Sequence, residues 1–389
     1  MDPVLNPYVP GAGRRPAALV GRDDVIKTWD TMLRRAERER TDPPLVLYGL
    51  RGVGKTVLLT RLRHDADGRE WITVQIEAGT GRSLREMVGE GLYGPLSDLA
   101  RPSAGKRLLR ALKTALSFKA SYDQTGSWSF GLDLSGESGG GADSGVLETD
   151  LKKILKDVSL AAAEEGKGLA LLIDEAQDLS TEDLTTLVAV SHAAAQDTWP
   201  VLFALTGLPS LPQTLSEAKS YSERFRFVEV ERLDSDSAAA ALADPAKAEG
   251  VAWDDEALSH VVECSGRYPY FIQQFGQEAW NAALGERIDR RAAELGVISG
   301  LGQLDNGFFR ARWDRTTQKE KGYLRAMCPE GEEGIGSGEV ANRLKRTIQS
   351  QSMVRRSLIR KGIVYAPDHG IVAFTVPGMV GFISRQHGE

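Results

Sequence analysis

Residues 49–56 read GLRGVGKT and follow directly on the apolar run Leu45–Tyr48. A glycine, four further residues and then Gly-Lys-Thr is the spacing of a phosphate-binding loop, when a strand precedes it and a helix follows. Two prolines break the chain before the expected strand, and an apolar helical pattern runs from Val57 to Leu62 after the loop. The alternative is a glycine-rich turn that binds nothing. Complete spacing in this context favours a site for a nucleoside triphosphate.

The residue types in this loop have separate roles in the prediction. Glycine has no Cβ, so backbone N–H groups can curl around an anion, and the N-terminus of the following helix adds its partial positive charge. The ammonium group of Lys55 would neutralise the β- and γ-phosphates, and the Thr56 hydroxyl would coordinate Mg²⁺. The predicted cofactors are therefore ATP and Mg²⁺. The predicted nucleotide-binding residues of the loop are Gly49, Gly52, Val53, Gly54, Lys55, Thr56 and Val57.

The length and composition define the class of protein. A chain of 389 residues, 41% apolar and 26% charged, fits a soluble globular protein of about two or three domains. Its two cysteines, Cys264 and Cys328, lie far apart without metal-ligand spacing, which favours buried thiols in a reducing compartment. No run of about eighteen apolar residues occurs, and the N-terminal sequence MDPVLNPYVPGAG lacks a signal-peptide pattern. We therefore expect a cytoplasmic protein with no membrane partner.

The charges are distributed unevenly along the chain. The whole sequence carries a net charge of −6. Residues 339–389 contain eight Lys or Arg against three Asp or Glu, which gives +5, so the remainder carries −11. A basic end on an acidic body indicates that an anionic polymer would be met at that end only. A solvated surface is the alternative that a charge count leaves open.

Strand and helix patterns alternate through the first part of the chain. Residues 1–20 are rich in Pro and Gly and predict an extended arm, after which a helix is expected from about residue 22 to Leu33. Strands alternating with helices indicate an α/β layer with a parallel sheet, whose most apolar strands would be covered on both faces. The expected strands are Leu45–Tyr48, Trp71–Ile76, Leu169–Ile173, Val201–Thr206 and Phe227–Val230.

One segment departs from this alternation. Residues 117–134 show an apolar period of two, notably at Trp128, Phe130 and Leu132, and residues 135–145 (SGESGGGADSG) form a glycine- and serine-rich tract. We expect a β-hairpin followed by a flexible loop, an insertion spanning residues 117–145. A hairpin that contacts DNA or a partner is one interpretation. An edge ribbon packed on the core is the favoured one.

The second half of the chain changes pattern twice. Residues 234–295 predict helices only, and beyond residue 304 a different order begins. There, three helices are followed by two short strands that a Pro-Asp-His-Gly turn joins, which is the order of a winged helix-turn-helix. The expected helices are 318–327, 338–345 and 350–361, and the expected strands are 363–366 and 371–375.

Two carboxylates follow the buried strand pattern at Leu169–Ile173. The carboxyl end of a parallel strand lies at the sheet edge that also carries a phosphate loop. Asp174 would hold Mg²⁺ through water, and Glu175 would orient or deprotonate the attacking water. Thr206 closes a neighbouring strand and could contact the γ-phosphate or that water. A helix-capping Asp-Glu pair and an ordinary β-branched strand end are the alternatives.

Together these motifs resemble the AAA+ ATPases, and within them the origin-recognition or initiator-like branch. The resemblance covers residues 20–385 and is carried by GRDDVI (residues 21–26), GLRGVGKT, LLIDEAQ, LTGLP, SYSERF and the helix–hairpin tail. GRDDVI and LLIDEAQ are also found in signalling (STAND) ATPases and in AAA+ regulators of transposition. The resemblance implies an α/β P-loop AAA+ core at 21–232, a helical lid at 233–300 and a C-terminal winged helix at 301–389.

The same resemblance implies two further arginines at the site. Arg224 in SYSERF stands where an arginine finger would reach the γ-phosphate of a neighbouring subunit, which implies a homo-oligomer; Arg226 is the competing candidate. Arg267, in the lid sequence SGRYPY, lies near the position of a second nucleotide-sensing residue. This lid sequence is closer to the Gly-x-Pro motif of signalling ATPases, so Pro269 could instead bring backbone against the nucleotide.

The implied winged helix would bring the basic end of the chain to double-stranded DNA. The third of its expected helices, 350–361, would enter the major groove of the DNA. The hairpin at His369 could touch the DNA backbone or the minor groove. Winged helices also dock proteins, which is the alternative. Its core is expected to contain Met353, Leu358, Ile359 and Val364. The predicted DNA-contacting residues are Arg343, Lys345, Arg346, Arg355, Arg356 and Arg360.

The function that these patterns favour is an ATP-dependent, DNA-binding AAA+ switch of initiator type. ATP would close the lid and order a subunit interface, and hydrolysis would release it. The second hypothesis is a STAND-like signalling ATPase, whose nucleotide state gates assembly with a protein partner.

Overall fold

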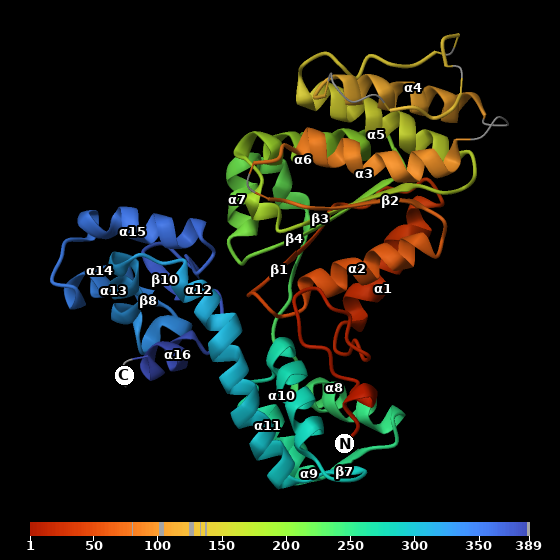
Figure 1. The fold of residues 1–389 in the computed structure, drawn as a ribbon. Helices are drawn as coiled ribbons and strands as arrows, with labels where there is room; N and C mark the ends of the chain where they lie inside the picture. The colour runs from red at the N-terminus through yellow and green to blue at the C-terminus, as the bar shows by residue number, and fades with distance from the viewer. Residues whose placement is uncertain (80, 101–104, 124–127, 133, 137, 387–389) are drawn as a thin grey trace.

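A parallel sheet forms the centre of the N-terminal part of the protein (Figure 1). The computed structural model describes residues 1–79, 81–100, 105–123, 128–132, 134–136 and 138–386. The strands of the sheet are β1 (Leu45–Tyr48), β2 (Ile72–Glu77), β3 (Leu169–Asp174), β4 (Val201–Gly207) and β5 (Arg226–Glu229). Their order is β2-β3-β4-β1-β5 and every pairing is parallel. The predicted α/β class is confirmed, and each expected strand agrees with the observed one to within one residue at either end.

Helices cover both faces of the sheet because its central strands are apolar along their length. Every residue of β3 and β4 is buried. The apolar sides of α1 and α2 join one core, and those of α3 to α6 join a second core on the other face (Figure 1). These helices are α1 (Asp23–Ala36), α2 (Lys55–Asp67), α3 (Leu84–Leu99), α4 (Lys106–Ala120), α5 (Leu147–Ala163) and α6 (Thr181–Gln196), with α7 (Leu211–Ala218) before β5.

The β-hairpin expected within residues 117–145 is wrong. Residues 117–120 are the last turn of α4, and no strand occurs in the described part of 121–145, which excludes 124–127, 133 and 137. The aromatic side chains that suggested a strand pack instead around Tyr93 of α3, with ring centroids 4.7 Å away for Trp128 and 5.8 Å for Phe130. A helix surface therefore buries these rings, and strand pairing is not needed to do so.

Four helices form the lid that follows the sheet: α8 (Ser235–Ala248), α9 (Asp255–Cys264), α10 (Pro269–Ala282) and α11 (Arg290–Gln303). The expectation of helices alone missed two short strands, β6 (Ala252–Trp253) and β7 (Arg287–Ile288), which pair in parallel. Two residues are too few to show an alternating pattern in the sequence. These strands therefore become visible only when the lid helices bring them together.

The N-terminal arm lies against the lid (Figure 1). Apart from a short 3₁₀ turn at Pro3–Leu5, residues 1–20 have no regular secondary structure, as predicted. Tyr8 is only 1% exposed, and its hydroxyl donates to Leu242 O at 2.5 Å and accepts from Trp253 Nε1 at 2.8 Å. The arm is therefore anchored on the lid before it returns to α1.

A continuous helical segment leads from the lid to the C-terminal part. Helix α11 runs into a π-helical turn, η4 (Leu304–Phe309), and then into α12 (Arg310–Asp314) (Figure 1). The predicted helices that follow are present, as is the predicted hairpin, while the strand β8 was not expected. The elements are α13 (Gln318–Met327), β8 (Ile335–Gly336), α14 (Ser337–Arg343), α15 (Ile348–Arg360), β9 (Val364–Tyr365), β10 (Ile371–Phe374) and α16 (Met379–Arg385).

The C-terminal elements pack around an antiparallel sheet of order β8-β10-β9. Leu358 and Val364 are fully buried, as expected, but the prediction for Met353 is wrong because 69% of it is exposed. Met353 shares the solvent-facing side of α15 with Arg356 and Arg360, which lie three and seven residues further along the helix. No helix among the described residues has the length and apolarity needed to cross a membrane.

The anchoring of the arm gives a first prediction. Tyr8→Phe should lower the free energy of unfolding by about 1–3 kcal/mol, because Leu242 O and Trp253 Nε1 lose their buried partner. Urea denaturation followed by tryptophan fluorescence measures this change. Val4→Ala, in the same arm but 87% exposed, is the control and should change stability by no more than about 0.5 kcal/mol. Equal stability of Tyr8→Phe and the wild type would contradict the anchoring role.

Candidate functional site

The loop of residues 49–54 connects β1 to α2 at the carboxyl edge of the sheet. Its first N–H, on Gly49, donates to Gly207 O at the end of β4, and a Cβ on Gly49 would lie 2.3 Å from Val230 O. Gly52 and Gly54 have φ angles of 87° and 95°, in the left-handed region that favours glycine. These glycines let the loop curl so that the N-terminus of α2 faces a cavity.

Lys55, the first residue of α2, holds the loop from inside. Its side chain is buried, and Nζ donates to Gly49 O at 2.9 Å and to Leu50 O at 2.8 Å. The pKa of Lys55 is lowered to about 8, chiefly because the side chain is buried; Arg51 contributes to the lowering, and Glu175 and Asp174 oppose it. Burial therefore disfavours the positive charge of Lys55, and an added anion would stabilise that charge.

Asp174 and Thr206 meet beside the loop. They lie at the carboxyl ends of the adjacent strands β3 and β4, and the Thr206 hydroxyl donates to Asp174 Oδ1. The same oxygen accepts the N–H of Glu175 at 2.9 Å. Both side chains are buried, so the carboxylate of Asp174 is fixed by the sheet.

Glu175 is held by two side chains. Its backbone adopts a left-handed φ of 49°, which turns the side chain out of the strand direction. Oε1 accepts from Arg51 Nη1 at 3.2 Å, and Oε2 accepts from Gln177 Nε2 at 2.7 Å. Gln177 in turn accepts the N–H of Leu208 at 3.0 Å, just beyond β4. Glu175 is therefore positioned by both the loop and the neighbouring strand.

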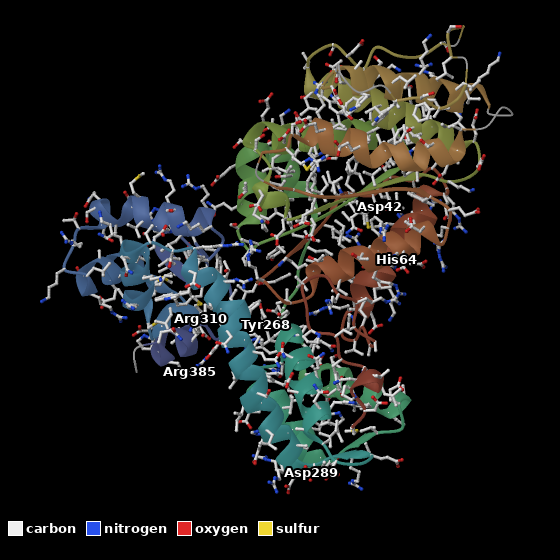
Figure 2. All side chains as sticks on the ribbon, viewed as in Figure 1. Asp42, His64, Tyr268, Asp289, Arg310 and Arg385 are labelled. Atoms are coloured by element: carbon white, nitrogen blue, oxygen red, sulfur yellow. The ribbon has the colours of Figure 1, made fainter. Side chains whose placement is uncertain are left out.

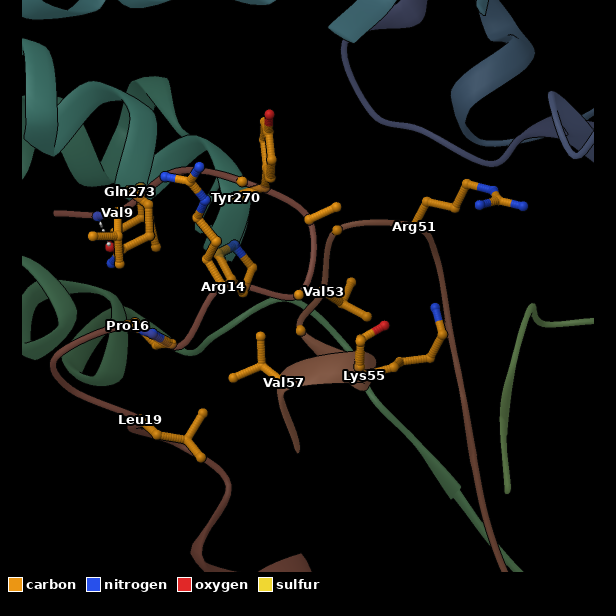
Figure 3. Close-up of a pocket in the computed structure, with 18 of the residues that line it drawn as sticks. Val9, Arg14, Pro16, Leu19, Arg51, Val53, Lys55, Val57, Tyr270 and Gln273 are labelled. Carbon is orange, nitrogen blue, oxygen red and sulfur yellow. Dashed lines mark hydrogen bonds between the residues drawn. The ribbon is translucent and has the colours of Figure 1, made fainter. Parts of the chain in front are cut away.

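The cavity above the loop is built by four parts of the chain (Figure 3). The loop and the start of α2 form its floor, the arm forms one wall, and residues of the lid and of the segment after it complete the wall. In Figure 3, Lys55 lies at the floor and Arg14 of the arm lies beside Tyr270 and Gln273 of the lid. Its charged lining residues are Arg14, Arg22, Arg51, Lys55, Glu175 and Arg312.

Most residues predicted for nucleotide binding line this cavity. Gly52, Val53, Gly54, Thr56 and Val57 do so together with Lys55. Gly49 lies beneath the lining, in the hydrogen bond to β4 described above.

The prediction for Arg267 is not supported, because its side chain is absent from the lining. Arg267 has a left-handed φ of 63° in the turn between α9 and α10, where its carbonyl accepts the N–H of Leu233. The residues that follow this turn, Pro269 and Tyr270, do line the cavity. The turn that the resemblance indicated thus borders the cavity through Pro269 and Tyr270, and not through the Arg267 side chain.

Arg224 lies at the opposite edge of the sheet from the cavity. It ends the 3₁₀ turn η3 (Ser220–Arg224), just before β5, and is exposed. Strand β5 pairs with β1 in parallel, with Arg226 opposite Leu45 and Glu229 opposite Tyr48. The loop follows Tyr48, so the full length of the strand separates it from the start of β5. Arg224 is therefore unable to complete the cavity of its own chain.

Half of the basic residues in the tail are committed to internal contacts. Arg343 pairs with Glu330 and Glu339, and Arg355 Nη2 donates to Ile371 O at 3.1 Å, so the groove-contact prediction for these two is not supported. Lys361 pairs with Glu320, and Arg385 with Asp305. The cations that are exposed and form no ion pair with any residue of the described chain are Lys345, Arg346, Arg356 and Arg360.

Several residues of the site were missed because no motif identifies them. Arg51 occupies one of the four positions that the loop pattern leaves unspecified. It nevertheless contacts the lid, the tail and Glu175. Its N–H donates to Thr375 O at 3.1 Å, and its carbonyl accepts from the Tyr268 hydroxyl. Figure 2 shows Tyr268 where the lid approaches the sheet. Arg14, Tyr270 and Arg312 reach the cavity only through the tertiary fold.

Comparison with known proteins agrees with this geometry. Residues 18–204 match the AAA ATPase domain family, and residues 306–383 match a domain of unknown function (DUF8462). Among curated proteins, none matches the sequence significantly. A Walker-type ATPase of Pyrococcus abyssi is similar over 98% of this chain and 99% of its own, with 16% identity and a TM-score of 0.62, so the two share a fold.

Two other solved structures are more distant. Orc1 of Aeropyrum pernix, in complex with DNA, has 15% identity and a TM-score of 0.46 over 96% of this chain and 94% of its own. The RuvB Holliday junction branch migration motor of Thermotoga maritima has 16% identity and a TM-score of 0.46 over 92% and 95%. Of these three structures, the Pyrococcus ATPase has the highest TM-score, 0.62, and it alone supports the fold. Residues 18–204 are therefore an AAA ATPase domain, in agreement with the loop and the two carboxylates, and the Pyrococcus ATPase shares the fold of the chain.

Proposed function

We propose that the protein is a nucleotide-dependent switch that binds ATP with Mg²⁺ in this cavity, hydrolyses it, and contacts DNA through its C-terminal part. The observation that carries the proposal is the meeting of Lys55, Asp174, Thr206 and Glu175 at one edge of the sheet. A buried cation behind a glycine loop suits phosphate, and a positioned carboxylate suits the activation of water.

The residues present also fit a magnesium ion. Thr56 lines the cavity, and Asp174 is a fixed carboxylate that favours the charged form of Lys55. A hydroxyl and a carboxylate are hard oxygen ligands, and Mg²⁺ usually needs only one or two such ligands beside water and phosphate. When bound, the ion would neutralise charge on the β- and γ-phosphates.

Glu175 would then act on the attacking water. To do so, one of its oxygens must exchange the hydrogen bond to Arg51 or Gln177 for one to water. The left-handed turn at Glu175 directs the carboxylate into the cavity, where it is part of the lining. Thr206 would keep Asp174 oriented while this exchange takes place.

Hydrolysis is tested by Glu175→Gln. This change should reduce ATP turnover by about 10²–10⁴-fold and leave the ATP dissociation constant within about threefold, because it removes the base and keeps the shape. Turnover and binding are measured by phosphate release and by calorimetry. Glu182→Gln, the same change at an exposed position at the start of α6, should have no effect. Wild-type turnover in Glu175→Gln would show that another group activates the water.

The pKa of Lys55 leads to a prediction of proton uptake. With a pKa of about 8, about half of the Lys55 side chains are neutral in the free protein at pH 8, and about a tenth at pH 7. Bound phosphates favour the charged form, so ATP binding should take up about 0.5 proton at pH 8, and affinity should fall as the pH rises above 8.

Calorimetry in two buffers of different ionisation enthalpy measures this uptake. Lys55→Arg is the matched control, since its guanidinium stays charged and should show no uptake at pH 8. Affinity of the wild type that stays constant between pH 7 and 9, without uptake, would contradict the placement of Lys55 against phosphate.

DNA contact is supported by the outer face of α15. Arg356 and Arg360 lie one turn apart there and form no ion pair with the described residues, while Lys345 and Arg346 lie just before the helix. The order α13–β8–α14–α15–β9–β10, with an antiparallel sheet, is consistent with a winged helix. Such a helix presents its exposed side chains to the major groove.

The DNA proposal is tested by changing Arg356 and Arg360 together to Ala. Duplex affinity should fall, and the slope of log affinity against log salt should become shallower by about 1.8, because two phosphate contacts are lost. Fluorescence anisotropy with a labelled duplex measures both. The double variant Lys247→Ala with Arg291→Ala removes the same charge from exposed positions of the lid and should leave the slope unchanged.

One observation favours the second candidate function, and another is consistent with a homo-oligomer. The contact of Thr375 O with the N–H of Arg51 joins the tail to the nucleotide loop, as a STAND-like signalling ATPase gated by its C-terminal part would require. Failure of the wild type to bind duplex at low salt would favour that second function. The exposed position of Arg224, remote from its own cavity, is consistent with a role in a neighbouring subunit of a homo-oligomer.

A further inference from the structure

Arg312 is a cavity residue that none of the sequence motifs contains. It lies in α12, the last turn of the helical segment that joins the lid to the tail, and its side chain lines the cavity with Arg51, Lys55 and Glu175. Arg312 Nη1 donates to Phe308 O at 2.6 Å, and the guanidinium lies 4.0 Å from the centre of the Phe308 ring. The side chain is therefore fixed in place rather than free in solvent.

No carboxylate of the described residues pairs with Arg312, and Glu175, which lines the same cavity, is paired with Arg51. Besides burial, the cations Arg51 and Arg315 lower the pKa of Arg312, and Tyr270 and Tyr268 oppose them. Burial, with a further contribution from Arg51, lowers the pKa of Arg312 to about 10. A partly buried arginine beside a second arginine is unfavourable without a counter-ion. We therefore expect an anion to bind beside Arg312.

The cavity indicates which anion this would be. Its cations come from four separate parts of the chain: Arg14 from the arm, Arg22 just before α1, Arg51 and Lys55 from the loop and α2, and Arg312 from α12. Glu175 is the carboxylate in this group, and Arg51 already contacts it. Several cations around one space fit a polyphosphate chain better than a single carboxylate.

We propose that Arg312 contacts the terminal phosphate of ATP. The proposal rests on the proposed function, in which ATP occupies this cavity. Arg312 lines the same cavity as Arg51, and Arg51 pairs with Glu175, the proposed water-positioning carboxylate, which marks the reacting end of the nucleotide. ADP lacks the phosphate at that end, so Arg312 distinguishes the two nucleotides.

This contact would link the nucleotide to the tail. Arg312 belongs to the segment Arg290–Asp314, in which the helices α11 and α12 are joined by η4 without a break in the chain of helical turns. The tail also touches the loop at Arg51, through Thr375 O. A phosphate held by Arg312 would thus act on both attachments of the tail, the helix that carries it and the loop against which it lies.

Arg312→Gln tests the proposal. Its affinity for Mg²⁺ with the non-hydrolysable analogue AMP-PNP should fall about ten- to a hundredfold, because a charge-assisted hydrogen bond is lost, while ADP affinity changes less than about threefold. Calorimetry measures both constants. Arg310→Gln is the matched control: Arg310 lies two residues away, is exposed, and is not among the residues that line the cavity. It should bind both nucleotides as the wild type does.

Arg312→Lys separates a phosphate contact from a structural role. Lysine keeps the charge but loses the planar fork, so AMP-PNP affinity should lie between those of the wild type and Arg312→Gln, with ADP affinity unchanged. Unchanged AMP-PNP affinity in Arg312→Gln, or equal losses for AMP-PNP and ADP in both variants, would overturn the proposal. Failure of the wild type to bind either nucleotide would instead refute the proposed function on which it rests.

Discussion

The parallel pairing of β3, β4 and β1 is the constraint on which the site depends. It brings three carboxyl ends to one edge of the sheet, so that the loop after β1 lies near Thr206 and Asp174. The hydrogen bond between these two side chains exists only in this strand order. Because both are buried, the carboxylate cannot turn away into solvent, and the geometry that magnesium and water would need is set by the sheet itself.

Beside this edge of the sheet, the lid and the tail both contact the nucleotide loop. The lid contributes the Tyr268 hydroxyl and the tail contributes Thr375 O, and both contact the backbone of Arg51, whose side chain pairs with Glu175. Arg51 is thus linked to the lid, the tail and the proposed catalytic carboxylate. A shift of the lid or tail would change these hydrogen bonds directly, which is a short physical path from nucleotide to the basic tail.

In the tail, the number of basic residues in the sequence differs from the number of basic side chains that are exposed and unpaired. Four of its eight Lys and Arg hold the C-terminal fold together, through ion pairs or, for Arg355, a bond to Ile371 O. The remaining four gather on and just before α15. Substitution of Arg343 or Arg355 would disturb packing and binding together, whereas Arg356 and Arg360 can be changed without loss of a hydrogen bond or an ion pair within the described chain.

The sequence by itself determined the strands of the sheet, the loop at 49–56 and the roles expected of Lys55, Asp174 and Glu175, because apolar periodicity and glycine spacing are local properties. It misjudged the aromatic residues at 128–132, since alternating rings can be buried on a helix as well as in a strand. Only the tertiary structure decided that Arg312 and not Arg267 faces the cavity, and that Arg51 joins the lid, the tail and Glu175. Those contacts join residues up to 324 positions apart along the chain, between Arg51 and Thr375, and no local pattern encodes them.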